Sequence, residues 1–303
     1  MNISYGVDGS YINVTYICLK QLCSNGIIVI PCGDGNRARF FSDPAVNLHK
    51  HILIQTSNIY ETYAQDCTIY IYLDTSTIQI IREDEMDNTL TRIHSKLLFK
   101  HGVLYDEVPE QKMVLRYLTG NEKVLELGSN VGRNTLVIAS ILSSKSKSKN
   151  NNNFVTVECD KYTAVCLREN RDLNNFSFPI ETAALSKRKL MQKGWDTEVG
   201  DVLKQGYNWV DTISLEELYN KYNIQFDTLV LDCEGAFYYI LMDMPEILDN
   251  INLIIMENDY HELHKKAYVN EVLRKNKFVV HYSESGGWGP CRDFFFEVWK
   301  KCV

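Results

Sequence analysis

The sequence predicts an α/β fold, in which a parallel β-sheet is covered by helices, with a small β-rich module in front of it. Two observations lead to this prediction. Short apolar runs typical of buried strands alternate with amphipathic runs typical of helices through most of the chain. Before them, short runs rich in β-branched and aromatic residues alternate with turn-forming residues. The 303 residues suffice for about two domains.

The β-rich module is expected over residues 1–80. Strand-like runs occur at 27–31, 51–56 and 67–74, and turns containing Gly, Asp or Pro separate them. The pattern does not assign a role to this module. It could bind glycans, or it could dimerise and make the protein a homodimer. The alternative is a simple packing appendage.

The second domain is expected over residues 81–303. Its lead-in, from about Ile78 to Gly120, has a helical and charged pattern, and Pro109 suits the first turn of a helix. Within the domain, the polar low-complexity segment 143–153 cannot bury apolar surface, so we interpret it as a flexible inserted loop. Three lysines there could instead contact nucleic acid, but a solvated linker is the simpler interpretation.

Composition limits the function classes. Lys and Arg total 32 against 39 Asp and Glu, for a net charge of −7, which argues against broad binding to nucleic-acid phosphates. The nine cysteines form no C-x-x-C pair, so we expect free thiols in a reducing compartment and no zinc site. The start of the chain does not resemble a signal peptide, and no apolar run approaches the ~20 residues that span a bilayer. These features predict a cytoplasmic protein without a membrane segment.

The strongest local motif is VLELGSNVGRNT, residues 124–135. A strand, a glycine-containing turn and a helix place backbone N–H groups and a helix N-terminus beside a ligand. The motif lacks a glycine of the dinucleotide pattern G-x-G-x-x-G, and an acidic group at the strand end suits an ammonium better than a phosphate. We therefore expect S-adenosylmethionine, whose methionine part is a zwitterion, in preference to NAD. The cofactor-contacting residues expected from this motif are Glu126, Gly128, Ser129, Asn130, Gly132 and Asn134.

A second acidic anchor is expected at the end of the next strand, where a carboxylate accepts both ribose hydroxyls. Glu158, followed by Cys159, occupies that position in FVTVECD. Its separation from Gly128 exceeds the ~20 residues typical of such units, and the inserted segment 143–153 accounts for the excess. A surface carboxylate at a strand end is the alternative.

Two carboxylates follow the strand in FDTLVLDCEGAF, residues 226–237. Because side chains two apart share a face of a strand, Asp232 and Glu234 are expected to point the same way. Such a pair can orient a methyl donor, accept a hydroxyl proton or bind a divalent cation. The alternative is that one of them caps the next helix, with Gly235 easing the turn.

The next strand, INLIIME, delivers further polar residues to the same edge, namely Glu257, Asn258, Asp259 and His261. They form a candidate substrate shelf. With Asp232 and Glu234, the carboxylates there could bind Mg²⁺, although we favour a site without metal. The HELH stretch is not a zinc-protease motif, because Lys265 stands where its second histidine belongs. The Gly-rich stretch from Ser285 is a candidate lid.

Taken in order, VLELGSNVGRNT, ALS (184–186), VDTISLEEL (210–218), LVLDCEGAF and LIIME resemble FkbM-type methyltransferases over about residues 105–303. The Asn-, Ile-, Lys- and Tyr-rich composition is similar to versions encoded by AT-rich genomes, including those of large DNA viruses. The resemblance implies a class I methyltransferase (Rossmann-like) fold, with a seven-stranded sheet of six parallel strands and one antiparallel strand. It also implies S-adenosylmethionine as methyl donor and O-methylation of a sugar, glycan or polyketide hydroxyl.

The resemblance assigns roles by position. Gly128, Asn130 and Gly132 would line the methionine moiety, Glu158 the ribose and Ala184 the adenine, while Asp232 and Glu234 would border the transfer site. One residue departs from the family pattern D-x-E-G-A-E, because Phe237 replaces its last Glu.

The sequence thus predicts an S-adenosylmethionine-dependent O-methyltransferase that acts on a hydroxyl of a carbohydrate or another small acceptor. The candidate general bases are Asp232 and Glu234, followed by Glu257. Two alternatives stay open. One is an RNA methyltransferase of the cap 2′-O type, although this sequence lacks lysines at the strand ends where that chemistry usually needs them. The other is a non-catalytic binding protein with this fold. A nucleic-acid partner is disfavoured, and so is an NAD-linked dehydrogenase.

Overall fold

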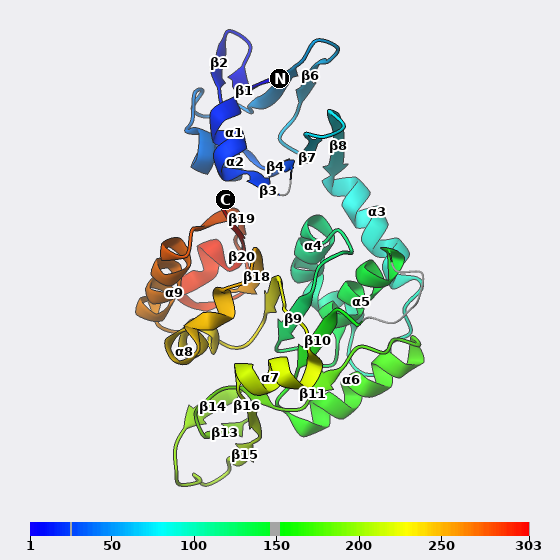
Figure 1. The fold of residues 1–303 in the computed structure, drawn as a ribbon, viewed down its shortest axis with the longest axis vertical. Coiled ribbons are helices and arrows are strands. Elements are labelled where there is room, and N and C mark those ends of the chain that lie inside the picture. The colour runs from blue at the N-terminus through cyan, green and yellow to red at the C-terminus, as the bar shows by residue number, and fades with distance from the viewer. Residues whose placement is uncertain (25, 146–151, 303) are drawn as a thin grey trace.

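The computed structural model describes residues 1–24, 26–145 and 152–302. Residues 2–82 form an N-terminal module with sheets of its own, and the remainder forms an α/β unit around a seven-stranded sheet (Figure 1).

The N-terminal module contains two four-stranded sheets, ordered β2-β1-β5-β6 and β3-β4-β7-β8, and two helices. Apolar side chains from both sheets, among them Ile3, Ile30 and Ile69, form a core within the module. Its elements are β1 (Asn2–Val7), β2 (Ser10–Asn13), α1 (Thr15–Gln21), β3 (Cys23–Ser24), β4 (Ile27–Ile30), α2 (Asp34–Phe41), β5 (His51–Gln55), β6 (Tyr60–Tyr63), β7 (Cys67–Tyr72) and β8 (Thr77–Arg82).

The last strand of the module corrects the predicted onset of helix near Ile78. Residues Thr77–Arg82 form β8, which pairs with β7 in antiparallel register, and helix α3 (Glu83–His94) begins only after it. The β-branched residues of TIQIIR favour an edge strand, and the charged EDE that follows suits the first turn of a helix.

The central sheet has the order β11-β10-β9-β17-β18-β20-β19. Neighbours from β11 to β18 pair in parallel, whereas β20 runs antiparallel to both β18 and β19. Six strands therefore run in one direction and one runs against them, which confirms the predicted fold class. The strands are β9 (Val124–Leu127), β10 (Phe154–Val157), β11 (Ile180–Glu181), β17 (Thr228–Leu231), β18 (Leu253–Glu257), β19 (Phe278–Glu284) and β20 (Phe296–Lys301).

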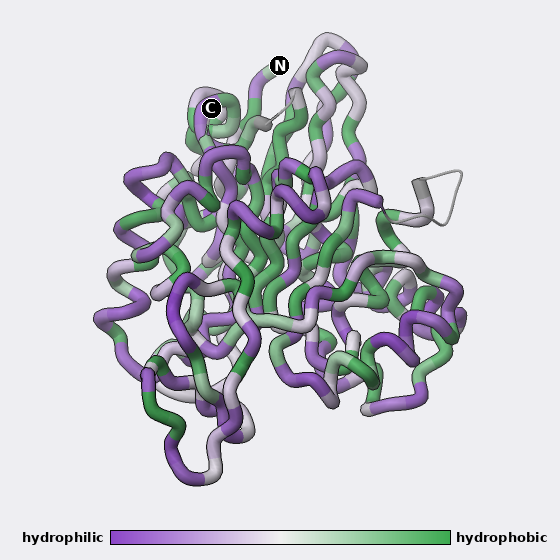
Figure 2. Tube along the Cα trace, turned by 60° about the horizontal axis from the view of Figure 1, so that its bottom comes forward, coloured by the Kyte–Doolittle hydropathy of each residue, from purple (hydrophilic) through white to green (hydrophobic). Residues whose placement is uncertain are grey.

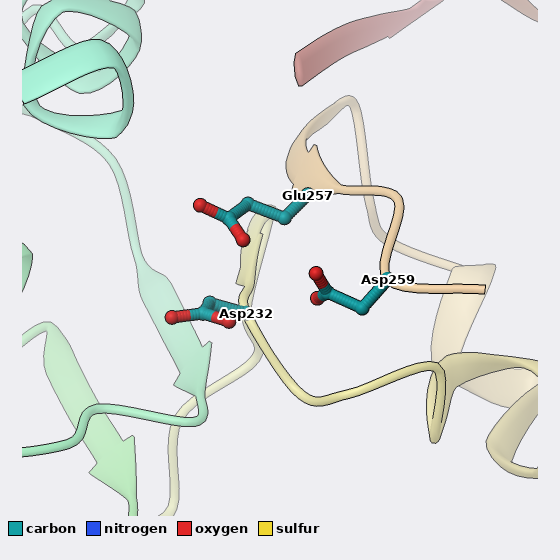
Figure 3. Close-up of side chains that lie close together, drawn as sticks. All are labelled: Asp232, Glu257 and Asp259. Carbon is teal, nitrogen blue, oxygen red and sulfur yellow. The ribbon is translucent and has the colours of Figure 1, made fainter. Parts of the chain in front are cut away.

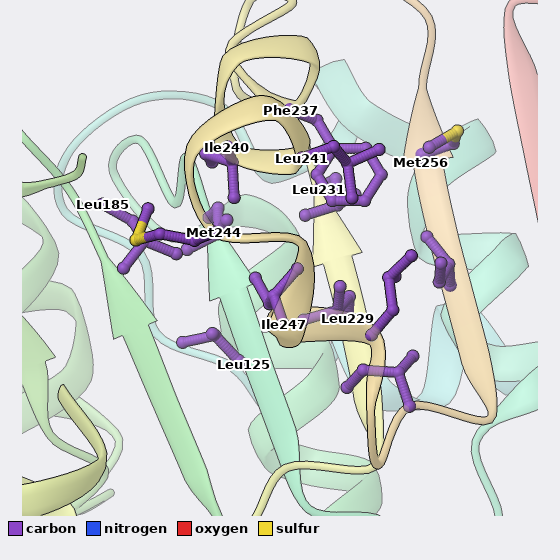
Figure 4. Close-up of a cluster of buried hydrophobic side chains, with 14 of the residues drawn as sticks. Leu125, Leu185, Leu229, Leu231, Phe237, Ile240, Leu241, Met244, Ile247 and Met256 are labelled. Atoms are coloured by element: carbon purple, nitrogen blue, oxygen red, sulfur yellow. The ribbon is translucent and has the colours of Figure 1, made fainter. Parts of the chain in front are cut away.

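Helices cover both faces of this sheet, which is why β9, β10 and β17 are buried along their whole length. One face packs against α3, α4 and α5, and the other against α7, α8 and α9. Figure 4 shows Ile240 and Leu241 of α8, and Met244 just after it, packed over Leu229 and Leu231 of β17. The strands are largely hydrophobic, while hydrophilic residues gather in the outer helices and loops (Figure 2). The helices are η1 (Leu104–Glu107), α4 (Val108–Tyr117), α5 (Arg133–Lys145), α6 (Lys161–Leu173), α7 (Leu215–Tyr222), α8 (Phe237–Asp243), η2 (Pro245–Leu248), α9 (Leu263–Lys275) and η3 (Gly289–Phe294).

A smaller β region lies between α6 and α7. It consists of a three-stranded antiparallel sheet, β14-β13-β15, and a parallel pair, β12-β16. Its turn between β13 and β14 carries the exposed Trp195. The strands are β12 (Ala184–Leu185), β13 (Leu190–Lys193), β14 (Asp196–Val199), β15 (Asn208–Val210) and β16 (Thr212–Ile213).

Buried polar contacts join the N-terminal module to the α/β unit. One ring nitrogen of His281, on β19, lies 2.7 Å from the Tyr117 hydroxyl of α4, and the other lies 2.7 Å from the Val29 carbonyl oxygen of β4. The Ser283 backbone N–H donates to Asn36 at 3.1 Å. The module is therefore docked on the β19 edge of the central sheet; its predicted role in self-association stays a prediction.

Of the predicted polar loop 143–153, residues 146–151 lie outside the described residues, and Ser143 to Lys145 continue α5 instead of forming loop. Each of the nine cysteines is a free thiol, as predicted. Within the described ranges, no helix combines the length and the apolar character needed to cross a membrane.

Candidate active site

The candidate site lies where the parallel strands β9, β10, β17 and β18 end. Open α/β sheets bind ligands in the crevice beyond the carboxyl ends of their strands. The polar residues singled out in the sequence follow these four strand ends, so the topology brings segments far apart in the sequence to one edge (Figure 1).

The glycine-containing loop after β9 has the predicted conformation. Gly128 and Gly132 have φ of 82° and 98°, and Asn130 is left-handed with φ of 49°. A Cβ atom on Gly128 would lie 1.6 Å from the backbone oxygen of Asp232, so only glycine lets this loop approach the end of β17. The Gly132 N–H donates to the Ser129 carbonyl at 2.9 Å, closing the turn before α5.

Glu126 is buried on the side of the sheet covered by α4 and α5, with 2 % of its surface exposed. The Thr156 hydroxyl donates to its carboxylate at 2.7 Å. Burial raises the pKa of Glu126 to about 8, while hydrogen bonds from Thr156 and Thr135 oppose the rise. Glu126 lines a small cavity in which acidic groups predominate; the other lining residues are Glu107, Glu110, Gly128, Ser129, Asn134, Val230 and Asp232.

Glu158 is buried at the end of β10 and bound to the loop after β9, so it is not the surface carboxylate of the alternative interpretation. It accepts one hydrogen bond from the Asn130 N–H and one from the Asp160 N–H, both at 2.8 Å. Burial raises the pKa of Glu158, and these backbone N–H groups lower it. The carboxylate is thereby fixed beside the glycine loop.

The other two predicted cofactor residues lie farther along the same edge. Cys159 follows Glu158, and its thiol contacts the Gln192 side chain of β13 at 3.6 Å. Ala184 begins β12 and its N–H donates to the Asp211 carbonyl at 2.8 Å. The small β region is thus the neighbour of this end of the site.

Three carboxylates converge at the ends of β17 and β18. One oxygen from each of Asp232, Glu257 and Asp259 lies within 4.8 Å of the others (Figure 3). We call these three residues the carboxylate cluster. Glu110, from the first turn of α4, reaches the cluster from the helix layer, and its carboxyl group adds to the rise in the pKa of Glu257.

The cluster concentrates negative charge in a desolvated place. Burial, and then the charge of Asp259, raise the pKa of Asp232 well above its usual range. Burial raises the pKa of Asp259 to about 7, with Glu234 adding to the rise, and burial together with the contact to Glu110 also raises the pKa of Glu257. Among the described residues, no Lys, Arg or His forms an ion pair with any member of the cluster.

Glu234 lies beside the cluster but is not a member of it. Strand β17 ends at Leu231, so the two-residue alternation no longer applies, and Glu234 adopts a left-handed conformation with φ of 50°. It does not cap α8 either, because the N-cap residue of that helix is Ala236 and makes no side-chain cap. Glu234 is exposed at the surface; partial desolvation of its carboxyl group raises its pKa, whereas the nearby His261 lowers it.

His261 and Trp288 lie on the outer side of this edge. Their rings are 4.7 Å apart between centroids, and Trp288 also contacts Phe295. The candidate lid residues Gly286 and Gly287 lie flat against Phe296 and Phe295, where a Cβ would come within 2.4 Å of each ring. Within the described residues, neither His261 nor His264 belongs to a group of potential metal ligands.

A buried network supports the loop that carries the cluster. The Glu297 carboxylate accepts hydrogen bonds from Lys266 at 2.5 Å, Trp299 at 3.0 Å and Asn258 at 3.1 Å. Because Asn258 lies between Glu257 and Asp259, this network fixes the backbone that presents both carboxylates.

The sequence did not point to Glu107 and Glu110. Both come from the helical lead-in, where a glutamate next to Pro109 has an ordinary place in a first helical turn. Only the packing of α4 against β18 brings Glu110 to the cluster, and no spacing rule contains that contact.

Comparisons with known proteins are limited to structural similarity. No family model matches the chain, and no curated protein matches it, so the FkbM resemblance stays a prediction. An O-methyltransferase of Bacillus cereus in complex with SAH is similar with a TM-score of 0.41 and 16% identity, over 73% of this chain and 92% of that chain. A methyltransferase of Pyrococcus furiosus has a TM-score of 0.38 and 13% identity, over 72% of this chain and 100% of that chain. The M1A22 tRNA methyltransferase of B. subtilis has a TM-score of 0.37 and 13% identity, over 63% of this chain and 65% of that chain. Similarities of this size leave the assignment of function to the residues of the site.

Proposed function

We propose that the protein is an S-adenosylmethionine-dependent O-methyltransferase, with a hydroxyl of a sugar or glycan as its acceptor. The observation that carries the proposal is the buried Glu126 carboxylate beside the glycine loop. Among the described residues, no cationic side chain pairs with Glu126. With a pKa of about 8, this buried group gives up its proton near neutral pH when a cation pairs with it, which favours a ligand that brings its own positive charge.

The cavity has room for about one water molecule, about 10 Å³, and the chemistry of its lining suits the ammonium group of S-adenosylmethionine. This group needs hydrogen-bond acceptors, and Glu126 and Glu107 line the cavity. The Asn134 side-chain oxygen lines it too, is buried, and has no hydrogen-bond partner among the described residues. A further acceptor for the ammonium group is therefore available. A dinucleotide pyrophosphate would instead face several carboxylates, which disfavours an NAD-linked enzyme.

Glu158 suits the ribose of the same cofactor. Each of its oxygens accepts one backbone hydrogen bond and retains a free lone pair for a hydroxyl group. Ala184 and Cys159 lie farther along the edge, on the side where the adenine would follow the ribose.

When bound, S-adenosylmethionine supplies an electrophilic methyl group on a sulfonium. The chain then has to hold the acceptor oxygen in line with that methyl group and take up the hydroxyl proton. Asp232, Glu234 and Glu257 are the candidate bases. Glu234 is outside the carboxylate cluster and beside His261. Its carboxylate oxygens can therefore accept the hydroxyl proton without taking part in the cluster. Loss of a general base costs about 10²–10⁴ in rate, which Glu234→Gln tests.

The test measures cofactor binding first and transfer second. Calorimetry should detect S-adenosylmethionine binding to the full-length protein, weakened at least about tenfold in Glu126→Gln, which loses an ionic contact. The matched control Glu216→Gln, at an exposed position on α7, should bind like the wild type. Absence of binding to the wild type would overturn the proposal.

The acceptor is tested with a labelled methyl donor offered to glycan, small-alcohol and RNA pools. Label in the glycan pool is expected. Label in RNA alone would replace the proposed acceptor with a nucleic acid, and binding without transfer to any pool would favour the non-catalytic alternative.

A further inference from the structure

We propose that the carboxylate cluster, together with Glu110, is a binding site for a divalent metal ion that prefers oxygen ligands, such as Mg²⁺ or Mn²⁺. The proposal that the cluster binds metal stands on its own geometry. Only its catalytic consequence rests on the proposed function.

The first step is the convergence of ligand atoms. Asp232, Glu257 and Asp259 come from the ends of two neighbouring strands, and each offers a carboxylate oxygen within 4.8 Å of the other two. Figure 3 shows the three side chains gathered in front of the strand ends. Oxygens that each lie about 2.0–2.6 Å from a common ion are spaced in this way.

The second step is independent of the cluster. Glu110 comes from α4, has only 8 % of its surface exposed, and one of its carboxylate oxygens is buried without a hydrogen-bond partner in the described structure. Glu110 lines the same cavity as Asp232, a member of the cluster, so this oxygen belongs to a side chain directed at the cluster. One oxygen of Asp259, itself 4 % exposed, is unpartnered in the same sense. Buried polar atoms without partners are costly and indicate a missing ligand.

The third step is a comparison within the same layer of the molecule. The buried carboxylate of Glu297, on β20, is paired with Lys266 at 2.5 Å. It also accepts hydrogen bonds from two further donors. The fold therefore supplies a cation where it buries that carboxylate. It supplies none for the cluster among the described residues, although four carboxylates meet there.

The chemistry of the ligands selects the ion. All the converging groups are carboxylates, and no His or Cys joins them in the described part of the chain. Hard oxygen ligands favour Mg²⁺, Mn²⁺ or Ca²⁺, whereas zinc sites in proteins draw on His and Cys.

The position of the site gives the ion a function. Asp232 belongs both to the cluster and to the lining of the cofactor cavity, so a metal ion here would lie beside the bound cofactor. A metal ion lowers the pKa of a bound hydroxyl and fixes its orientation. Glu234 then remains as the neighbouring carboxylate free to take up the proton.

The experiment uses the full-length protein, stripped with chelator and free of S-adenosylmethionine, and titrates it with MnCl₂. Calorimetry and the electron paramagnetic resonance signal of Mn²⁺ should report one bound ion. Asp259→Asn should raise the Kd for Mn²⁺ at least about tenfold, and Glu110→Gln should raise it as well. Both variants remove like-charge repulsion, so neither is expected to unfold the protein.

Two further variants separate this proposal from the proposed function. Glu126→Gln should lose affinity for S-adenosylmethionine and keep the Mn²⁺ site, whereas Asp259→Asn should do the reverse. Glu216→Gln, exposed on α7, should change neither. If wild type binds no Mn²⁺, or if Asp259→Asn binds it equally well, the metal proposal is wrong, and the carboxyl groups instead share protons. That result would leave the cofactor proposal intact.

Discussion

The cofactor side and the cluster side of the site are built on opposite principles. On the cofactor side, Glu126 and Glu158 each accept hydrogen bonds from neighbouring protein groups, which fix them before any ligand arrives. On the cluster side, Asp232, Glu257 and Asp259 face one another, and a buried oxygen of Asp259 has no partner among the described groups. The difference teaches that the first side is preorganised by the chain alone, whereas the second depends on a ligand's positive charge.

The largest effect should come from Gly128, which holds the two sides together. In Gly128→Ala the new Cβ would meet the Asp232 backbone oxygen at 1.6 Å, so the loops must separate. We expect a loss of about 3–5 kcal/mol in the free energy of unfolding and no measurable cofactor binding. Urea denaturation and calorimetry check this.

Gly9→Ala is the matched control for Gly128→Ala. Gly9 has the same φ of 82°, with nothing within 4 Å of the added Cβ, so it carries the conformational cost without the collision. Equal losses in the two variants would show that left-handed strain, and not the junction of the two sides, is responsible.

Glu126 should make stability depend on pH. Its pKa is about 8 in the folded chain against 4.5 in the unfolded one, so the folded state retains the proton longer. The stability that comes from this raised pKa is fully present below pH 4.5 and is lost as the pH rises through about 8. As the pH rises through this window, the free energy of unfolding of Glu126→Gln should therefore increase relative to that of the wild type, by up to about 1.4 kcal/mol per pH unit.

Urea denaturation of cofactor-free protein at about pH 5, 6.5 and 8 measures the Glu126 effect, because the difference between the two proteins cancels the titration of the cluster. If the difference in the free energy of unfolding between the two proteins does not change with pH, Glu126 is ionised throughout this range. The cavity is then more polar than the burial of Glu126 indicates.

A smaller effect is expected at Glu158. Glu158→Gln keeps the shape of the side chain but removes the charge that accepts the Asn130 and Asp160 N–H groups. A hydrogen bond to a charged group contributes about 1.5–3 kcal/mol, so the Kd for S-adenosylmethionine should rise about 10- to 100-fold. Calorimetry measures it, with Mn²⁺ affinity as the internal control. A change in Mn²⁺ affinity of the same size would contradict the separation of the two sides.

The smallest effect on ligand binding should come from Glu234, which belongs to neither side. Glu234→Gln should leave the affinities for S-adenosylmethionine and Mn²⁺ within about twofold of the wild type, as for a surface position. The same two titrations check this. A tenfold loss of Mn²⁺ affinity would place Glu234 among the ligands and redraw the cluster.

The sequence sufficed for the parts of the fold and site that depend on neighbours in the chain. The apolar strands predicted the central sheet, and the glycine loop and Glu158 were found from one motif and the strand that follows it. It did not suffice for β8, whose β-branched run directly adjoins the charged first turn of α3, or for β13 to β15, which are only three or four residues long and show no alternation of apolar and polar residues.

The cluster marks the same limit within the site. The alternation rule paired Asp232 with Glu234, but β17 ends before both, and the left-handed Glu234 departs from strand geometry. The rule suits Glu257 and Asp259 better, since these lie two apart and do share the cluster. Glu110 depends on the packing of a helix onto a sheet, which is a property of the tertiary structure and not of local sequence.

The contact of His281 with the N-terminal module has a consequence for its proton. A carbonyl oxygen can only accept, so the ring nitrogen beside Val29 must carry the hydrogen, and the other nitrogen accepts from the Tyr117 hydroxyl. The docked ring is thus restricted to a single neutral tautomer, and burial keeps its pKa well below 6.5. A separated module would let the imidazole take a second proton as the pH falls below 6.5, so acid favours the separated form. The junction is therefore a latch that acid loosens through the His281 ring, whose hydrogen-bond partners are a hydroxyl group and a backbone carbonyl.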